Sequence, residues 1–123
     1  MKTHIFRLKP NQDLKAELTK ISKEIDGFII TCVGSLNRAT LRTADESIID
    51  LDGPFEIVSL TGTLCKDGVH FHISLSDKDG KTFGGHLKDN CTIHTTAEIV
   101  IGESDIKLSR VFDEQTGFKE LFF

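Results

Sequence analysis

The chain has 123 residues, of which 38% are hydrophobic and 28% are charged, and its formal net charge is −4 at pH 7. This length and composition predict one soluble globular domain over residues 1–123. The acidic balance argues against a broad basic surface for nucleic acid, because phosphate binding depends on clustered Lys and Arg.

The sequence also argues against a membrane or secreted protein. No apolar run approaches the ~18 residues that a membrane span needs, and the N-terminal segment lacks the apolar stretch of a signal peptide. Cys32, Cys65 and Cys91 are odd in number and widely spaced, with no CxxC motif. This pattern predicts buried free thiols in a reducing cytoplasm.

The N-terminal quarter predicts a strand followed by the one convincing helix. Residues 3–8 form a strand-like segment that ends before Pro10. Residues 11–26 predict an amphipathic helix, with Asn11 as its N-cap and Gly27 just past its end. Its apolar face is Leu14, Leu18, Ile21 and Ile25.

The rest of the chain predicts strands. They cover residues 28–35, 38–42, 55–65, 69–77, 81–87, 91–102 and 106–112. A turn at 35–37 separates the first two, and residues 46–54 are loop-like. The apolar tail 116–123 is expected to pack on the sheet or on another subunit. One helix and about seven or eight mostly antiparallel strands predict an α+β domain whose sheet is rolled toward a barrel.

Three of the five histidines lie in two adjacent strands that can be registered from their turn. The segment 77–81, "DKDGK", fits a three-residue loop with Gly80 in the left-handed conformation. Counting back from this turn places His72 opposite His86. Gly84 then lies on the histidine face and leaves room there for a ligand or solvent.

The preceding hairpin extends the same face. A two-residue turn at Asp67–Gly68 places Cys65 opposite His70 and Thr63 opposite His72. With this register one face is apolar: Leu60, Leu64, Phe71, Ile73, Leu75, Phe83 and Leu87. The other face is polar: Thr61, Thr63, Cys65, His70, His72, Ser74 and His86. The consistent character of the two faces supports the register.

His70, His72 and His86 therefore predict a metal site. Cross-strand Cβ atoms lie ~5 Å apart, so three imidazoles can converge on one ion at ~2.1 Å each. Three neutral His ligands suit Zn²⁺ or a similar divalent cation, with water, Cys65 or a group from a neighbouring subunit in the fourth position. The alternative is a hydrogen-bonded polar face without metal.

Three further residues are candidates to support the site. Cys65 and Thr63 share the histidine face. Glu98 shares a strand face with His94, opposite Ala97 and Ile99. It would act as a hydrogen-bond partner of a ligand, or as a general base, if this face adjoins the histidines.

Several segments together resemble the plants-and-prokaryotes-conserved (PPC) domain. They are "VGSLNRATLR" (33–42), "FEIVSLTGTL" (55–64), "HFHISLSDKDGKTFGGHL" (70–87) and "TTAEIVI" (95–101). The order and content resemble the prokaryotic stand-alone form, which carries the HxH…GGH pattern. The resemblance implies a mostly antiparallel α/β domain that assembles as a homotrimer.

The plant relatives, the AT-hook nuclear-localized proteins, carry this domain after AT-hook segments that enter the DNA minor groove. This chain has no AT-hook, and Pro54 stands where the plant "GRFEIL" element has Arg. The resemblance therefore implies the fold and the trimer, with DNA as a partner only by association.

Three functions remain open at this point. The first is a trimeric, DNA-associated or regulatory module with a His₃ metal site. The second is a metal-dependent enzyme of hydrolase or lyase type, because a His₃ metal with an open position activates water. The third is a small-ligand sensor without metal.

Overall fold

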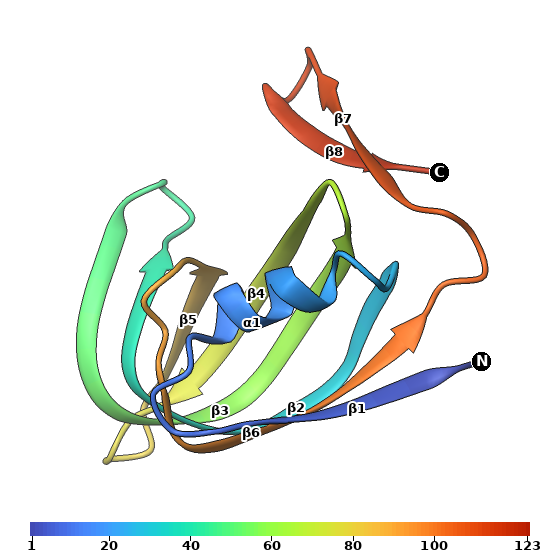
Figure 1. Cartoon of the computed structure of the whole chain (residues 1–123). Helices are drawn as coiled ribbons and strands as arrows, with labels where there is room; N and C mark the ends of the chain where they lie inside the picture. Colours follow the sequence, from blue (N-terminus) through green and yellow to red (C-terminus); the bar gives the residue numbers. More distant parts are fainter.

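Six strands form one strongly curved antiparallel sheet, and the last two strands form a separate hairpin (Figure 1). The computed structural model describes all 123 residues. The elements are β1 (Thr3–Leu8), α1 (Leu14–Ile21), β2 (Gly27–Arg42), β3 (Ile48–Cys65), β4 (Gly68–Ser76), β5 (Thr82–Leu87), β6 (Ile93–Glu103), β7 (Ser109–Asp113) and β8 (Phe118–Phe122). One helix and eight strands confirm the predicted α+β class.

The sheet rolls until β5, at one edge, meets the end of β2. Its strand order is β1-β6-β2-β3-β4-β5, and β5 also pairs with the end of β2. This closure joins Leu41 to Leu87 and Arg42 to His86. The four strands β2 to β5 therefore surround a common interior, as the prediction of a rolled sheet required.

The concave side of the sheet holds the hydrophobic core. The apolar face predicted for the two histidine hairpins lies inside it, with Leu75 fully buried and Phe71 1% exposed. Helix α1 lies across this side (Figure 1) and buries Leu14 and Leu18 completely. The polar face of β4 and β5 is consequently left on the outside of the barrel.

The helix is shorter than the predicted span of residues 11–26. It begins after Asp13, not Asn11, and ends at Ile21. The Asp13 Oδ2 atom accepts a hydrogen bond from the Ala16 backbone N–H at 2.9 Å, and Oδ1 accepts one from Cys91 N–H at 2.9 Å. Asp13 therefore caps the helix and ties it to the start of β6. Gly27, expected to follow the helix, is the first residue of β2.

Two predicted interruptions are wrong. Segments 28–35 and 38–42 form one strand, β2, with an irregularity between Leu36 and Arg38 in place of a turn. Most of 46–54, expected to be a loop, belongs to β3. The end of β2 pairs with the beginning of β3, with Arg38 opposite Asp52 for example. This pairing between strands overrides the weak local strand signal of residues 46–54.

The β3–β4 register differs from the prediction by two residues. The turn is at Lys66–Asp67, so Cys65 lies opposite Gly68, Thr63 opposite His70 and Thr61 opposite His72. The assignment of faces survives because a shift of two residues returns every side chain to the same side of a strand.

The C-terminal hairpin β7–β8 stands away from the large sheet (Figure 1). The tail pairs with β7 and not with the large sheet, so the first of its two expected placements is wrong, and packing on another subunit stays a prediction. Much of the hairpin is apolar and exposed: Val111, Phe112, Phe118, Leu121, Phe122 and Phe123. No helix has the length and hydropathy needed to cross a bilayer.

Candidate metal centre

The β4–β5 turn sets the alignment of the histidines. Asp77 N–H donates to the Lys81 carbonyl at 2.9 Å, and Gly80 N–H donates to the Asp77 carbonyl at 3.0 Å. Gly80 adopts a φ of 79°, the left-handed conformation predicted for it. His72 consequently lies opposite His86, as predicted.

The glycine pair lets β5 fit between its two neighbours. A Cβ atom on Gly84 would lie 2.2 Å from the Ile73 carbonyl oxygen of β4. A Cβ atom on Gly85 would lie 2.7 Å from the Arg42 carbonyl oxygen of β2. Gly84 does line the cleft beside the histidines. Its missing side chain, however, serves the close approach of β4 and β5 more than it opens space for a ligand.

The three imidazoles form a compact triangle. The ring centroids are 5.0 Å apart for His70 and His72, 5.1 Å for His70 and His86, and 5.6 Å for His72 and His86. The Nε2 atoms of His70 and His72 lie 3.3 Å apart. One ring nitrogen from each histidine lies within 4.8 Å of the other two.

These distances fit a shared divalent cation. Three imidazoles bound tetrahedrally at ~2.1 Å place their ligand nitrogens ~3.4 Å apart and their ring centroids roughly 5 Å apart. The observed values are close to this geometry. In addition, the Nδ1 atom of His86 is buried and has no hydrogen-bond partner. The donor set, three imidazoles without a thiolate, suits a zinc-like ion.

The surroundings keep His70 and His86 neutral, the form that binds metal. Burial, with the positive charge of Arg42, lowers the pKa of His86 to about 4. Burial also lowers the pKa of His70, and His72 and Arg110 lower it further. At pH 7 a metal ion therefore has little proton competition at these two rings.

The predicted supporting residues are placed unequally. Thr63 lies opposite His70, and its hydroxyl accepts a hydrogen bond from Arg110 Nη2 at 2.7 Å. Cys65 is fully buried, its thiol 3.7 Å from the Gly68 carbonyl oxygen, and it is not among the clustered ligand atoms.

Glu98 lies far along the sheet from the cluster. It is on β6, opposite Arg7 of β1 and Val33 of β2, and β6 does not neighbour β4 or β5. The structure therefore does not bring Glu98 to the three histidines.

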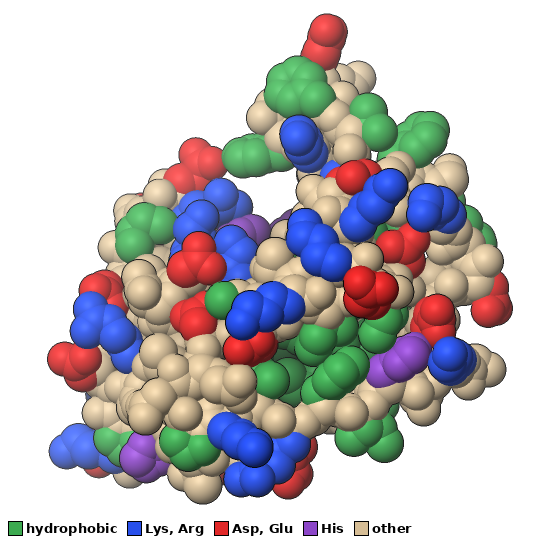
Figure 2. Space-filling model, in the orientation of Figure 1, with side chains coloured by type: hydrophobic (Ala, Val, Ile, Leu, Met, Phe, Trp, Pro, Cys, Tyr) green, Lys and Arg blue, Asp and Glu red, His purple; other side chains and the backbone are tan.

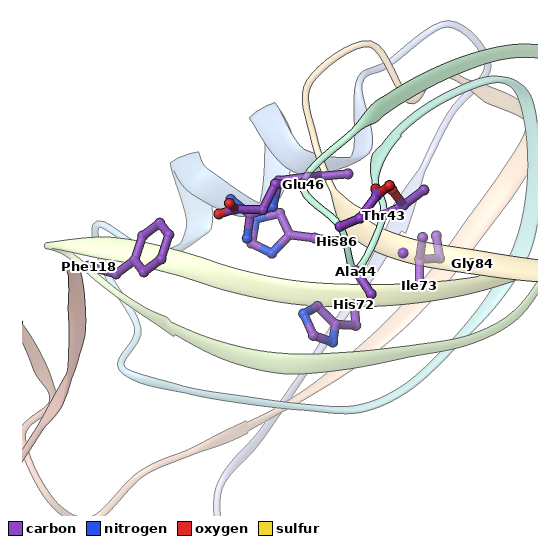
Figure 3. A pocket seen from close by; sticks show the side chains of 11 residues that line it. Thr43, Ala44, Glu46, His72, Ile73, Gly84, His86 and Phe118 are labelled. Carbon is purple, nitrogen blue, oxygen red and sulfur yellow. The ribbon is translucent and has the colours of Figure 1, made fainter. Parts of the chain in front are cut away.

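A cleft of 620 Å³ opens beside the cluster, below the C-terminal hairpin (Figure 2). His72 and His86 line it, together with Phe118 of β8 and Glu46 (Figure 3). The full lining is Arg42, Thr43, Ala44, Asp45, Glu46, His72, Ile73, Gly84, Gly85, His86 and Phe118. A smaller hollow of 170 Å³ lies next to His70 and His72.

The sequence interpretation missed the two arginines of this region. Arg42 comes into place only through the closing pair of β2 and β5, and Arg110 only through the projecting hairpin. Neither contact follows from the local hairpin patterns that located the histidines.

Comparison with known proteins identifies similar chains. The bifunctional protein GlmU of Synechococcus sp. (strain JA-3-3Ab) is 44% identical over 98% of this chain, which spans 20% of that protein's length. A hypothetical protein from Salmonella cholerae-suis has a similar solved structure, with 36% identity, a TM-score of 0.92 and coverage of 98% of this chain and 91% of that one.

A metal-containing protein from Archaeoglobus fulgidus is also similar in structure. It is 27% identical, with a TM-score of 0.80 and coverage of 100% of this chain and 94% of that one. The family model of the Plants and Prokaryotes Conserved (PCC) domain matches residues 1–105. This is the domain, abbreviated PPC above, that the sequence motifs resemble. The chain therefore belongs to the Plants and Prokaryotes Conserved domain family.

Proposed function

We propose that this chain is a metal-binding module in which His70, His72 and His86 hold one divalent cation, zinc in preference to others. The observation that carries the proposal is the imidazole triangle, whose centroid spacings of 5.0 to 5.6 Å are those of three rings on one tetrahedral ion. The neutral state of His70 and His86 supports it. So does the similarity to the metal-containing protein of A. fulgidus.

Metal analysis of protein purified without a polyhistidine tag tests the proposal. We expect about one ion per chain in the wild type and a large loss in His72→Ala and His86→Ala. His94→Ala is the matched control, because His94 is exposed on β6 and outside the cluster. The proposal fails if the wild type carries well under one ion per three chains and His72→Ala is indistinguishable from it.

We also propose that the module works as a homotrimer in the cytoplasm, as the resemblance and the free thiols imply. Apolar side chains on three strands of the large sheet support an assembly: Ile5, Ile30, Val33 and Val58 are 46% to 77% exposed. Light scattering after gel filtration should give three times the 13.7 kDa of one chain. A monomer at micromolar concentration would contradict the assembly without affecting the metal proposal.

A second candidate function is hydrolase or lyase catalysis, favoured by the cleft of 620 Å³ that opens onto His72 and His86. A divalent cation with three protein ligands keeps one coordination position open and lowers the pKa of water there to about 7. Glu46 lines the same cleft and could accept a proton. A substrate screen with and without chelator tests this candidate. Turnover that survives full metal removal would count against it.

DNA association has weaker support. Arg38 of β2 forms ion pairs with two carboxylates of β3. Its Nη2 lies 2.5 Å from Asp50 Oδ2, and its Nη1 lies 3.3 Å from Asp52 Oδ1. Its charge is therefore not available to phosphate. A gel-shift series between 25 and 200 mM salt (roughly the range over which phosphate contacts weaken) tests it. No shift at the lowest salt would remove DNA from the candidates.

A further inference from the structure

Two arginines flank the histidine cluster and have no acidic partner. Arg42 lies opposite His86 at the closure of the barrel, and its side chain makes no ion pair. Its guanidinium carbon lies 5.7 Å from the centre of the Phe118 ring. Arg38, four residues earlier on the same strand, pairs with two carboxylates. The carboxylates of β3 that pair with Arg38 are Asp50 and Asp52, and neither pairs with Arg42.

Arg110 approaches the cluster from the other side. Its Nη2 donates to the Thr63 hydroxyl at 2.7 Å, and Thr63 lies opposite His70. Its Nη1 donates to the Lys119 carbonyl at 3.4 Å, but its Nε is buried with no partner. The guanidinium is therefore fixed beside His70 while part of its hydrogen-bonding capacity is unused.

Three basic side chains lie around the histidines. Arg42 is paired with His86 across β2 and β5, and Lys88 follows His86 by two positions. Arg110 bonds to Thr63, which lies opposite His70. The sign of this local charge is opposite to the net charge of −4 of the whole chain. A region arranged in this way attracts anions.

The two carboxylates that line the cleft, Asp45 and Glu46, pair with neither arginine. Asp45 accepts hydrogen bonds from the Thr43 hydroxyl at 2.6 Å and from Ser47 N–H at 3.1 Å, within its own turn. Glu46 makes no ion pair with either arginine. A divalent cation on the histidines would offset the two negative charges of these carboxylates.

We propose that a small oxyanion, a carboxylate or phosphate group, binds over the histidine cluster where the cleft opens. Arg42 would hold it from the lining of the cleft, and Arg110 from the His70 side of the cluster, outside that lining. The inference rests on the proposed function insofar as the histidines hold a cation. Guanidinium groups suit this task because their planar donors match carboxylate and phosphate oxygens. The cleft of 620 Å³ is the size of small-molecule sites.

The C-terminal hairpin determines which anion fits. The family model matches residues 1–105, whereas Arg110 and Phe118 come from β7 and β8 beyond it. Figure 3 shows the Phe118 ring at one edge of the cleft, apart from His72. Because the Arg42 guanidinium carbon lies 5.7 Å from the centre of this ring, the ring borders the anionic group that Arg42 would hold.

Titration calorimetry with inorganic phosphate and with malonate tests the inference on metal-loaded protein. We expect saturable binding of at least one of them to the wild type and a Kd at least tenfold higher in Arg42→Gln and in Arg110→Gln. Arg38→Gln is the matched control, since it removes an equal charge from β2 and should bind as the wild type does. The phosphate and malonate arms distinguish the two anion classes.

Three results would overturn the inference. One is that neither anion binds the metal-loaded wild type. Another is that Arg42→Gln and Arg110→Gln, with melting curves like that of the wild type, retain full affinity. The third is that a short DNA duplex binds more tightly than phosphate and loses binding in the same variants, because the ligand would then be a macromolecule. Arg110→Lys, which keeps the charge, controls for a folding defect of the hairpin.

The metal content of each sample separates the two proposals. If the wild type holds its metal but binds neither anion, this inference fails and the metal function stands. If the protein holds no metal yet binds phosphate through Arg42 and Arg110, the metal function fails and the anion site stands. Unchanged metal in Arg42→Gln with weakened anion binding supports both.

Discussion

The imidazoles of His70 and His72 approach to 3.3 Å between their Nε2 atoms, although both side chains belong to one strand and their backbone positions are separated by a full pleat. Side chains at i and i+2 of a strand are usually parallel and ~7 Å apart. These two therefore lean toward one point, and His86 of β5 leans toward the same point. This convergence is the basis of the first prediction.

Metal removal should lower the melting temperature of the wild type. A ligand that binds only the folded chain adds ~4 kcal/mol at a free concentration about a thousand times its Kd. We therefore expect chelation to lower the midpoint by several degrees in a thermal melt. His72→Ala should melt at the same temperature with and without chelator, and His94→Ala should behave as the wild type.

Gly85→Ala should destabilise the barrel closure. The new Cβ would lie 2.7 Å from the Arg42 carbonyl, a backbone oxygen that cannot move without shifting β2. We expect a loss of ~2 kcal/mol or more in the free energy of unfolding. Denaturant unfolding measures it.

Gly80→Asn provides the comparison for that change. Gly80 has a φ of 79°, but no atom lies within 4 Å of the position of its Cβ. Asn tolerates the left-handed conformation, so this variant should cost well under ~1 kcal/mol. Equal losses in the two variants would refute the close-approach explanation of Gly85.

Asp13→Ala should weaken the attachment of the helix to the sheet. The variant removes both the cap on Ala16 N–H and the hydrogen bond to Cys91 N–H, which lies 78 positions away. We expect a loss of ~1–2 kcal/mol or slightly more, because a buried N–H is left without its partner. Asn11→Gly, at the position first predicted for the cap, should cost less, because Gly also adopts the φ of 71° found there. The reverse order would restore the original assignment.

Buried thiols should make the protein less stable in alkali. Burial raises the pKa of Cys32 to about 12 and that of Cys91 to about 11, from an ordinary value near 9.0. The stabilisation is fully present below pH ~9, and it declines at higher pH because only the unfolded chain releases the proton. Between pH 8 and 10 each thiol should cost about 1 kcal/mol.

Denaturant unfolding of the wild type and Cys32→Ala at both pH values measures this effect. The variant is less stable at pH 8, because it leaves a small cavity. The difference between the two proteins should shrink by about 1 kcal/mol at pH 10. A constant difference would show that Cys32 does not titrate on unfolding in this range.

The parts of the fold that sequence could predict are those fixed by local chemistry. The turn around Gly80 fixed the pairing of His72 with His86, and alternation fixed the buried face. The cap at Asp13 was missed because its second hydrogen bond goes to Cys91, and Asn11 offers a similar local signal. The β3–β4 turn was displaced because Asp67–Gly68 favours a tight turn one residue later than the observed one.

The arginines of the candidate site depend on long-range contacts. Arg42 lies opposite His86 because two strands separated by more than forty positions close the barrel. Arg110 belongs to β7, and no pattern in the sequence of β4 or β5 predicts that the C-terminal hairpin contacts them. Only the arrangement of whole strands in space shows that these charges surround the histidines.

All three imidazoles come from one hairpin, β4–β5, and His70 and His86 are sixteen positions apart. Closing so short a segment costs little chain entropy and takes well under a millisecond. All three proposed ligands are therefore in place as soon as this one hairpin forms, whether or not β6 and the C-terminal hairpin have joined it.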